Sequence, residues 1–446
     1  MRNSIRLFPA CLLLAAACSD VPDPTSPAAA GLRATGAVHA NAERYAAIGT
    51  SISMGWASNG VYDETQRTSW VAMLGDRTEG FAVPFIDAPG CTPPLVAPLG
   101  AFRRLSGESA APSGVCAPNA ADVTLPENNV GIAGAIAAHA VLVKPEIAPA
   151  TAPWYKRVLP VGHTQLTAAL SQNPTLVSVE LGGNEVLNGS SGLVLDGVTI
   201  VPFANFVAPY TAILNALGGR KVLLVGMPTD LRNIPMMRHA SEIWAERDSF
   251  ALLNVAVQPN CETEDTWINV SLKTLGTVAA AAASPVPVPY SCANAAGIDY
   301  VLTPADVDVL NQRMADMDAF IRGQAQARGF AYTTLGEIYD RPGIKGRYSV
   351  MAQLTSEHPY GVWVSLDGVH PSPLAHRFLA RAAARAVRET YGVHLLPDES
   401  DLIAVPQAEL GTTFTLERAR AAAAGLRGAE LPVCPMPGEC RLDGMR

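Results

Sequence analysis

Four short apolar segments, separated by stretches with helical spacing, constrain the fold of this 446-residue chain most strongly. Each segment is rich in residues that favour buried strands, and glycine or polar residues follow it. The segments are residues 45–48, 176–181, 221–227 and 330–333. Strands that alternate with helices are typical of an α/β domain with a parallel sheet. Ligands of such domains bind at the carboxyl edge of the sheet.

Two longer helices are predicted in the second half of the chain. The first begins with Thr303 as its cap and Pro304 at its first position, and the second runs from residue 372 to 391 with Gly392 as its stop. Apolar side chains recur in the first helix at spacings of three and four, which predicts a face packed on the core. These side chains are Val307, Leu310, Met314, Met317 and Ile321.

The overall charge argues against nucleic acid as a partner. The formal net charge is −8, and no run of Lys or Arg is interleaved with aromatic residues. Hydrophobic residues make up 49% of the chain and charged residues 16%, so the composition is that of a globular protein with a sizeable core. Its oligomeric state does not follow from the sequence.

The N-terminus predicts export. Arg2 and Arg6 precede a short apolar stretch, residues 7–17, which is typical of a signal peptide and too short to span a bilayer. Small residues before Cys18 resemble a bacterial lipobox, so we expect lipidation of Cys18 and a membrane lipoprotein that faces the periplasm or the cell surface. Because Ala15 stands where leucine is usual, cleavage near residue 17 and secretion is the alternative.

The cysteines predict disulfides and no metal site. If the signal peptide is removed and Cys18 is lipidated, six cysteines remain, and an oxidising compartment favours their pairing. No CxxC motif or clustered Cys/His spacing indicates a metal, and no cofactor is expected. Proximity in the sequence favours the pairs Cys91–Cys116, Cys261–Cys292 and Cys434–Cys440.

Residues at four loops are candidates for a catalytic site. Ser51 follows the first strand, Gly134 ends a brief strand-like run, and Asn184 follows a pair of glycines after the second strand. Asp367 and His370 lie in a tight turn ahead of the last helix. A carboxylate three residues before a histidine can accept a hydrogen bond from Nδ1–H and leave Nε2 free as a base. Taken singly, each of these residues is also common in an ordinary turn.

In combination and in this order, these four loops resemble the sequence blocks of the SGNH hydrolases, also called the GDSL esterases and lipases. Residues 49–53 (GTSIS) are similar to the first block of that family, and residues 129–135 (NVGIAGA) to its glycine block. Residues 182–185 (GGNE) are similar to its third block. Residues 367–370 (DGVH), followed by Pro-Ser, are similar to the closing block. The resemblance spans roughly residues 42–392.

The resemblance implies a three-layer α/β/α sandwich, flavodoxin-like, around a parallel sheet of about five strands. It implies Ser51 as nucleophile, His370 as general base and Asp367 as its orienting partner. Backbone N–H groups of Ser51 and Gly134 and the Asn184 amide would hold the oxyanion. The implied activity is a serine esterase or lipase that cleaves acyl esters of lipids or carbohydrates through an acyl-enzyme. Acyl transfer by the same serine, or a surface binding protein without turnover, are the alternatives.

Two positions depart from the family pattern, and several residues compete for the assigned roles. Thr50 and Glu185 each replace an aspartate of the family, which puts the substrate preference in question. Ser53 is the nearest other nucleophile, and residues 89–92 could supply the glycine of the oxyanion site. His358 and His376 are the competing bases, and a metal site of Asp367, His370 and His376 has low specificity.

The predicted organisation is one enzyme domain with flanking segments. The Pro-, Ala- and Ser-rich tether would reach about 25 Å as a coil. A strand at residues 81–86 and a small hairpin at residues 189–202 are also expected. The segments are a signal peptide at 1–17, a tether at 18–42, a hydrolase domain at 43–395 with insertions near 87–127, 186–203 and 232–300, and an extension at 396–446.

Overall fold

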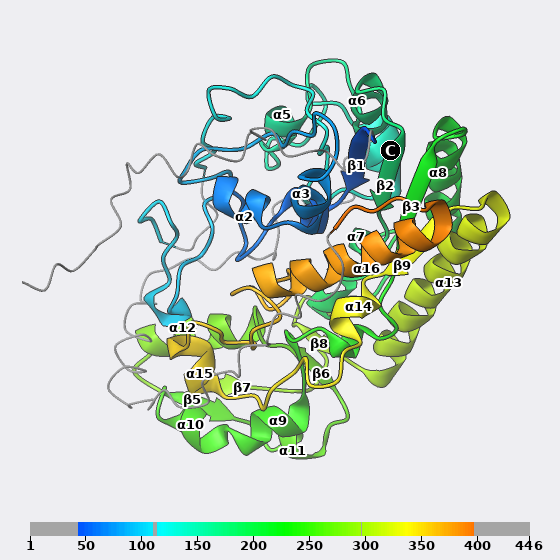
Figure 1. Cartoon of the computed structure of the whole chain (residues 1–446). Helices are drawn as coiled ribbons and strands as arrows, with labels where there is room; N and C mark the ends of the chain where they lie inside the picture. The colour runs from blue at the N-terminus through cyan, green and yellow to red at the C-terminus, as the bar shows by residue number, and fades with distance from the viewer. Residues whose placement is uncertain (1–42, 110–113, 296, 397–446) are drawn as a thin grey trace, which may run out of the picture. The chain divides into compact units, whose positions relative to one another are not determined.

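The structure, a computed structural model, describes residues 43–109, 114–295 and 297–396 (Figure 1). The chain divides into the units Met1–Val38 and His39–Arg446, and every described residue belongs to the second. The expectations for the signal peptide, for lipidation of Cys18, for the tether and for the pair Cys434–Cys440 lie outside the described residues.

A parallel four-stranded sheet forms the centre of the fold, with the order β1-β2-β3-β9. An isolated parallel bridge joins Asn129 to Ala47 on the free side of β1. When this bridge is counted as a rudimentary strand, the order in chain sequence becomes 2-1-3-4-5, which is the flavodoxin-like order. The sheet therefore has four full strands and a fifth position reduced to one bridge. The strands are β1 (Tyr45–Gly49), β2 (Leu176–Glu180), β3 (Lys221–Gly226) and β9 (Ala331–Thr334).

Helices cover both faces of this sheet and give the three layers (Figure 1). One face carries α4 (Ala137–Leu142), α6 (Gln165–Ser171), α8 (Phe203–Ala216) and α13 (Pro304–Arg328). The opposite face carries α3 (Trp70–Gly75) and α16 (Pro373–Tyr391). Because both faces are covered, every residue of β1 and β2 is buried, as expected for strands of a parallel α/β sheet.

The two long helices begin and end at the residues that their sequences predict. The Thr303 side chain caps α13 by accepting a hydrogen bond from the Asp306 N–H, and Gly329 ends the helix at a φ of +67°. Ser372 caps α16, and Gly392 ends it. The five apolar side chains predicted on the inner face of α13 are all buried. The helices are thus held by packing on the sheet as well as by their caps.

Residues 231–302 and 350–355 fold into small elements that lie beyond the carboxyl edge of the central sheet (Figure 1). They contain an antiparallel sheet with the order β4-β6-β8 and a parallel pair β5-β7. The strands are β4 (Met237–His239), β5 (Val255–Val257), β6 (Trp267–Asn269), β7 (Val288–Tyr290) and β8 (Val301–Leu302). The helices are η4 (Leu231–Asn233), α9 (Ala240–Ala245), α10 (Arg247–Ala251), α11 (Asn260–Thr263), α12 (Lys273–Ala283) and α15 (Val350–Thr355).

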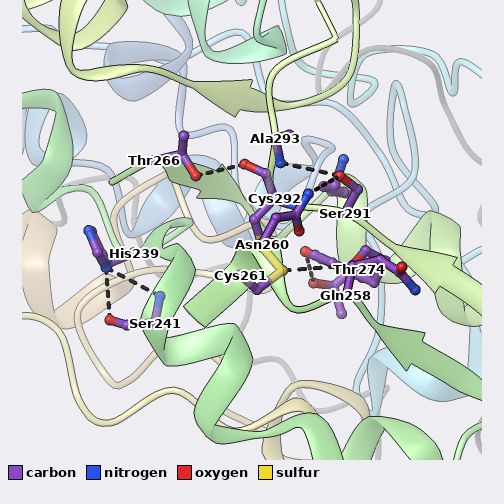
Figure 2. The surroundings of a disulfide bond; sticks show 12 residues. His239, Ser241, Gln258, Asn260, Cys261, Thr266, Thr274, Ser291, Cys292 and Ala293 are labelled. Atoms are coloured by element: carbon purple, nitrogen blue, oxygen red, sulfur yellow. Dashed lines mark hydrogen bonds between the residues drawn. A yellow bond between two sulfur atoms is a disulfide. The ribbon is translucent and has the colours of Figure 1, made fainter. Parts of the chain in front are cut away.

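Two disulfides are present, Cys91–Cys116 and Cys261–Cys292. Figure 2 shows the second, where it joins α11 to the segment after β7. The Asn260 side chain accepts a hydrogen bond from the Cys292 N–H at 3.1 Å and donates one to the Ser291 hydroxyl at 2.8 Å. Because the elements around it are short, this bond and its polar neighbours hold together a region with little regular secondary structure of its own.

Two expected elements are absent from the described residues. Residues 81–86 form no strand, and only Ile86 makes a bridge, to Asn119. Pro84 has no N–H to donate within a ladder, which explains why the segment does not pair. Residues 189–202 form no hairpin: a 3-10 helix, η3 (Asn188–Ser191), is followed by a loop. The remaining short helices are α1 (Ser51–Met54), α2 (Asp63–Arg67), η2 (Leu99–Ala101), α5 (Tyr155–Val158), α7 (Asn184–Leu187) and α14 (Gly336–Tyr339).

Among the residues that the structure describes, no helix combines the length and the apolar character needed to cross a bilayer.

Candidate active site

Ser51 lies at the carboxyl end of β1, where it is the first residue of the one-turn helix α1. The Thr50 side chain caps this turn through the Ile52 N–H. Gly55 ends the turn at a φ of +85°, in the left-handed region that glycine adopts without strain. A Cβ at position 55 would lie 2.6 Å from the Gln66 Cα, so only glycine fits there. The chain therefore turns sharply and presents Ser51 at the edge of the sheet.

Ser51, His370 and Asp367 form one chain of hydrogen bonds. The Ser51 Oγ lies 2.9 Å from the His370 Nε2, and the His370 Nδ1 lies 2.9 Å from the Asp367 Oδ2. An ionised carboxylate can only accept, so Nδ1 carries the proton that faces Asp367. In a neutral imidazole, Nε2 is then the acceptor for the Ser51 hydroxyl. This arrangement can take the hydroxyl proton as the oxygen attacks an electrophile.

The Asp367 carboxylate is kept ionised by its surroundings. Burial alone would raise its pKa, but the neighbouring His370 and several hydrogen bonds outweigh burial and lower the pKa to about 2. The Oδ1 atom accepts the N–H groups of Val369 and His370, at 3.0 and 2.9 Å, and the Ser365 hydroxyl. The Oδ2 atom accepts the Asn59 N–H at 2.9 Å in addition to His370. Each of these hydrogen bonds, from Asn59, Ser365, Val369 and His370, is one that the carboxylate accepts.

The loop that carries Asp367 is held from three directions. Ser58, in the loop after α1, donates its N–H to the Ser365 Oγ and accepts the Leu366 N–H. Tyr339, at the end of α14, donates its hydroxyl to the Val369 carbonyl at 2.6 Å. Met236 donates its N–H to the Gly368 carbonyl at 3.0 Å. Since Met236 belongs to the predicted insertion, one function of that insertion is to support the loop with the histidine.

The backbone N–H groups of Ser51 and Gly134 have no acceptor among the described residues. Gly134 is the third residue of a turn that is closed by a 3.1 Å hydrogen bond from the Ala135 N–H to the Ile132 carbonyl, and its φ is +76°. A Cβ at Gly134 would meet no atom within 4 Å, so open space lies beside this residue. Paired free donors of this kind can stabilise a developing oxyanion.

Asn184 begins α7, just after the end of β2, and is 8% exposed. One Nδ2 proton is donated to the Ala135 carbonyl at 2.9 Å, which ties the amide to the residue after Gly134. An amide nitrogen carries two protons, so the second remains for a ligand. Asn184 therefore supplies a donor and also anchors the neighbouring glycine turn.

The Asn184→Ala variant is expected to lower kcat for an ester by about 10²–10³-fold, the usual cost of losing one oxyanion donor. KM is expected to change much less, because the interaction strengthens in the transition state. Steady-state kinetics on a p-nitrophenyl ester measures both values. An Asn184→Ala enzyme with the kcat of the wild type would exclude this amide from the oxyanion site.

Glu180 connects the nucleophile turn to the neighbouring strand. This buried side chain at the end of β2 accepts the Thr50 N–H at 3.0 Å and the hydroxyl groups of Thr50 and Ser53, both at 2.9 Å. The Ser53 hydroxyl is thus committed to a carboxylate and is fully buried, which leaves Ser51 as the available serine. Burial raises the Glu180 pKa, and these hydrogen bonds oppose that rise. Thr50 thus binds Glu180 through both its backbone N–H and its hydroxyl.

Glu185 links α7 to the start of α4. Its Oε1 accepts the Ala137 N–H at 2.7 Å, which replaces the cap that the Ile136 side chain cannot provide. Its Oε2 is buried and has no hydrogen-bond partner among the described residues. Burial raises the Glu185 pKa to about 7, with a smaller contribution from the nearby Glu180. Together, Asn184 and Glu185 hold the two residues on either side of Ile136.

The raised pKa of Glu185 makes the free energy of unfolding depend on pH. Its usual pKa is 4.5, and in the folded chain the pKa is about 7. Between these values the folded state binds more protons than the unfolded state, so stability falls as pH rises through this range, by roughly 3 kcal/mol. Glu185→Gln keeps the Oε1 acceptor and removes this titration. We expect urea unfolding at several pH values to show a smaller decline for Glu185→Gln than for the wild type, whereas the exposed control Glu262→Gln leaves the decline unchanged.

The competing candidates lie in other settings. His376 is buried on α16, and its Nδ1 accepts the Trp70 N–H. His358 is exposed in a loop. Gly90 donates its N–H to the Asp87 carbonyl, so it has no free donor for an oxyanion, unlike Gly134. In the part of the chain that the structure describes, no group of three or more His, Cys, Asp or Glu side chains could hold a metal ion.

Three contributors to the site do not stand out in the sequence. Glu180 looks like an ordinary polar residue at the end of a strand, and only its alignment with Gly49 in the sheet reveals its role. Asn59 acts through its backbone N–H, which no side-chain pattern can predict. Trp154 donates its indole N–H to the Ala133 carbonyl from a segment without any motif. The strand pairing and the tertiary packing, rather than spacing, bring these residues to the site.

Comparison with protein-family models finds no match, and comparison with curated proteins finds no related sequence. Solved structures with some similarity include a protein from Parabacteroides merdae that is provisionally described as a GDSL-like lipase. It shares 12% sequence identity at a TM-score of 0.33, over 78% of this chain and 97% of its own. The extracellular lipase of Streptomyces rimosus shares 13% identity at a TM-score of 0.29, over 76% of this chain and 100% of its own. Similarities at such values carry no argument about the roles of the residues at this site.

Proposed function

We propose that this protein is a serine esterase or lipase of the SGNH type, which cleaves carboxylic esters through an acyl-enzyme. The observation that carries the proposal is the pair of 2.9 Å hydrogen bonds from Ser51 to His370 and from His370 to Asp367. These three residues come from two loops far apart in the chain. Without a chemical role, a buried serine, histidine and aspartate in this order would be an uncommon way to fill the edge of a sheet.

In the acylation step, the Ser51 Oγ attacks the ester carbonyl carbon while its proton moves to the His370 Nε2. The carbonyl oxygen becomes an oxyanion, which the N–H groups of Ser51 and Gly134 and the Asn184 amide would stabilise. As the tetrahedral intermediate collapses, the bond to the alcohol oxygen breaks. His370 then gives its proton to that oxygen, and the alcohol leaves.

In the deacylation step, a water molecule takes the place of the alcohol. His370 accepts one proton of the water, its oxygen attacks the acyl carbon, and the same donors stabilise the second oxyanion. As the bond to the Ser51 Oγ breaks, His370 returns its proton to that oxygen, which releases the carboxylic acid and restores the hydroxyl. The Asp367 carboxylate remains ionised throughout and holds the imidazolium in place, in keeping with its pKa of about 2.

A panel of p-nitrophenyl esters from acetate to palmitate, assayed with the purified chain, tests the proposal. We expect hydrolysis of at least one ester, with release of p-nitrophenol and the free acid in equal amounts. The dependence on chain length identifies the acyl class, which the motifs leave open. Absence of turnover on every ester, in a folded protein, would contradict the proposal.

A further inference from the structure

The orientation of one peptide group decides whether Gly134 can serve the oxyanion. Its N–H belongs to the peptide between Ala133 and Gly134, the central peptide of the turn from Ile132 to Ala135. Turns of this kind exist in two forms that differ by a flip of the central peptide, and a positive φ at the third residue marks one of them. With a φ of +76°, Gly134 is in that form. A flip would turn its N–H away from the site.

The indole of Trp154 holds this peptide in its observed orientation. The Trp154 Nε1 donates a hydrogen bond to the Ala133 carbonyl at 3.0 Å. The Ala133–Gly134 peptide is trans, so its carbonyl and its N–H point in opposite directions. Fixing the carbonyl toward Trp154 therefore fixes the Gly134 N–H toward the opposite side, where it has no acceptor among the described residues.

Trp154 is itself rigidly placed next to the nucleophile turn. The side chain is fully buried, and its ring packs edge-on against Trp56 at a centroid distance of 5.0 Å. Trp56 in turn donates its backbone N–H to the Ser51 carbonyl at 2.9 Å. The Trp154 indole, which orients the Gly134 peptide, is thus packed against Trp56, whose backbone is hydrogen-bonded to that of Ser51.

We propose that Trp154 is a positioning residue that orients the Gly134 N–H toward the oxyanion. This inference rests on the proposed esterase function. Trp154 touches no reacting atom, and its effect passes through one carbonyl. If the hydrogen bond is lost, the central peptide of the turn becomes free to sample both orientations. Only one of these orientations presents the donor, so the transition state loses stabilisation while the binding of the ester changes little.

The test compares two tryptophan variants that differ in one respect. Trp154→Phe keeps an aromatic ring but removes the Nε1–H bond to Ala133. Trp70→Phe is the matched control, because Trp70 is equally buried and its Nε1 has no hydrogen-bond partner among the described residues. Both variants lose the same atoms from the core, and thermal unfolding of each verifies that the assay temperature lies below both melting temperatures.

For Trp154→Phe we expect kcat to fall about 10- to 100-fold with KM nearly unchanged, less than the 10²–10³-fold cost of deleting a donor. The affinity for butylboronic acid, which forms a tetrahedral adduct with an active serine, is expected to weaken in proportion to kcat/KM. Trp70→Phe is expected to keep both values near those of the wild type. Equal kinetics in the two variants would overturn the inference, since a purely structural tryptophan would act in that way.

Two further experiments distinguish a failure of this inference from a failure of the proposed function or of folding. Replacing Trp154 by benzothienylalanine substitutes sulfur for the Nε1–H within an almost identical ring, so it serves if Trp154→Phe does not fold. It is expected to reproduce the loss in kcat, and a normal kcat would overturn the inference. The wild type and Ser51→Ala are assayed in parallel. If the wild type has no Ser51-dependent turnover, the proposed function fails and this inference fails with it, whereas an active wild type with unaffected Trp154 variants contradicts this inference alone.

Discussion

The Ser51→Ala variant is expected to lose about 10⁶-fold in kcat on any ester that the wild type hydrolyses, as is usual when the nucleophile of such a triad is removed. Without the hydroxyl, no acyl-enzyme forms, and only the oxyanion donors and substrate binding remain. The fold is expected to persist, because a single buried hydroxyl is lost at the edge of the sheet. Initial rates at high enzyme concentration, with circular dichroism as a control for folding, measure the effect.

Ser53→Ala is the matched control for this variant. The Ser53 hydroxyl is fully buried and donates to Glu180, so its loss removes one of several bonds to that carboxylate and no nucleophile. We expect Ser53→Ala to keep most of the activity. If Ser51→Ala hydrolyses the ester at the rate of the wild type, or if only Ser53→Ala is inactive, the assignment of the nucleophile is wrong.

Asp367→Asn is expected to reduce kcat by about 10⁴-fold, because the amide favours the wrong tautomer of the histidine. The effect should be severe here, since every hydrogen bond of the carboxylate is one that it accepts. Oδ1 accepts two backbone N–H groups and the Ser365 hydroxyl, and Oδ2 accepts the Asn59 N–H and His370. In either orientation, an NH₂ group at this position would face donors. The measurement is kcat at a fixed pH near neutrality.

The same variant is expected to be less stable. The Asp367 pKa is lowered in the folded chain to about 2, so its carboxylate stabilises the fold above the unfolded pKa, and this contribution is lost as pH falls toward 2. At pH 7 it is worth roughly 2.5 kcal/mol. Urea unfolding at pH 7 should show at least that loss in Asp367→Asn.

The control for Asp367→Asn is Asp265→Asn, which alters a second Asp–His pair. Asp265 lies 2.9 Å from the His239 Nε2, but its side chain is 80% exposed. Exposed pairs contribute little to stability, so we expect this variant to match the wild type in kcat and in urea unfolding. Equal losses in both variants would mean that Asp367 acts only as a structural partner of His370.

The sequence was sufficient to predict the strands of the central sheet and the residues of the hydrogen-bonded chain. Ser51 follows a buried strand, and Asp367 precedes His370 by three residues, so local spacing indicates both the sheet edge and the Asp–His contact. The contact between the two loops depends on the tertiary structure. In the sequence, only the order of the four blocks that resemble the SGNH hydrolases indicates it.

The supporting residues could not be predicted, because their roles arise from strand register and packing. Glu180 reaches Thr50 and Ser53 only because β2 pairs with β1 so that Glu180 lies opposite Gly49. Trp154, the residue that caps the start of α5, reaches Ala133 from the other side of α4 in the chain, so no local spacing indicates the contact. The small sheets of residues 231–302 cannot be predicted either, because strands of two or three residues are too short for a pattern of alternation to appear.

Labelling with a fluorophosphonate probe, followed by peptide mass spectrometry, tests the central claim most directly. The probe transfers its phosphonyl group to a serine oxygen only where a base activates that oxygen. We expect one modified residue, Ser51, in the native protein and no modification after denaturation or in Ser51→Ala. Modification of Ser53 or another serine, or no modification of the native protein, would contradict the assignment of Ser51, His370 and Asp367 as the catalytic residues.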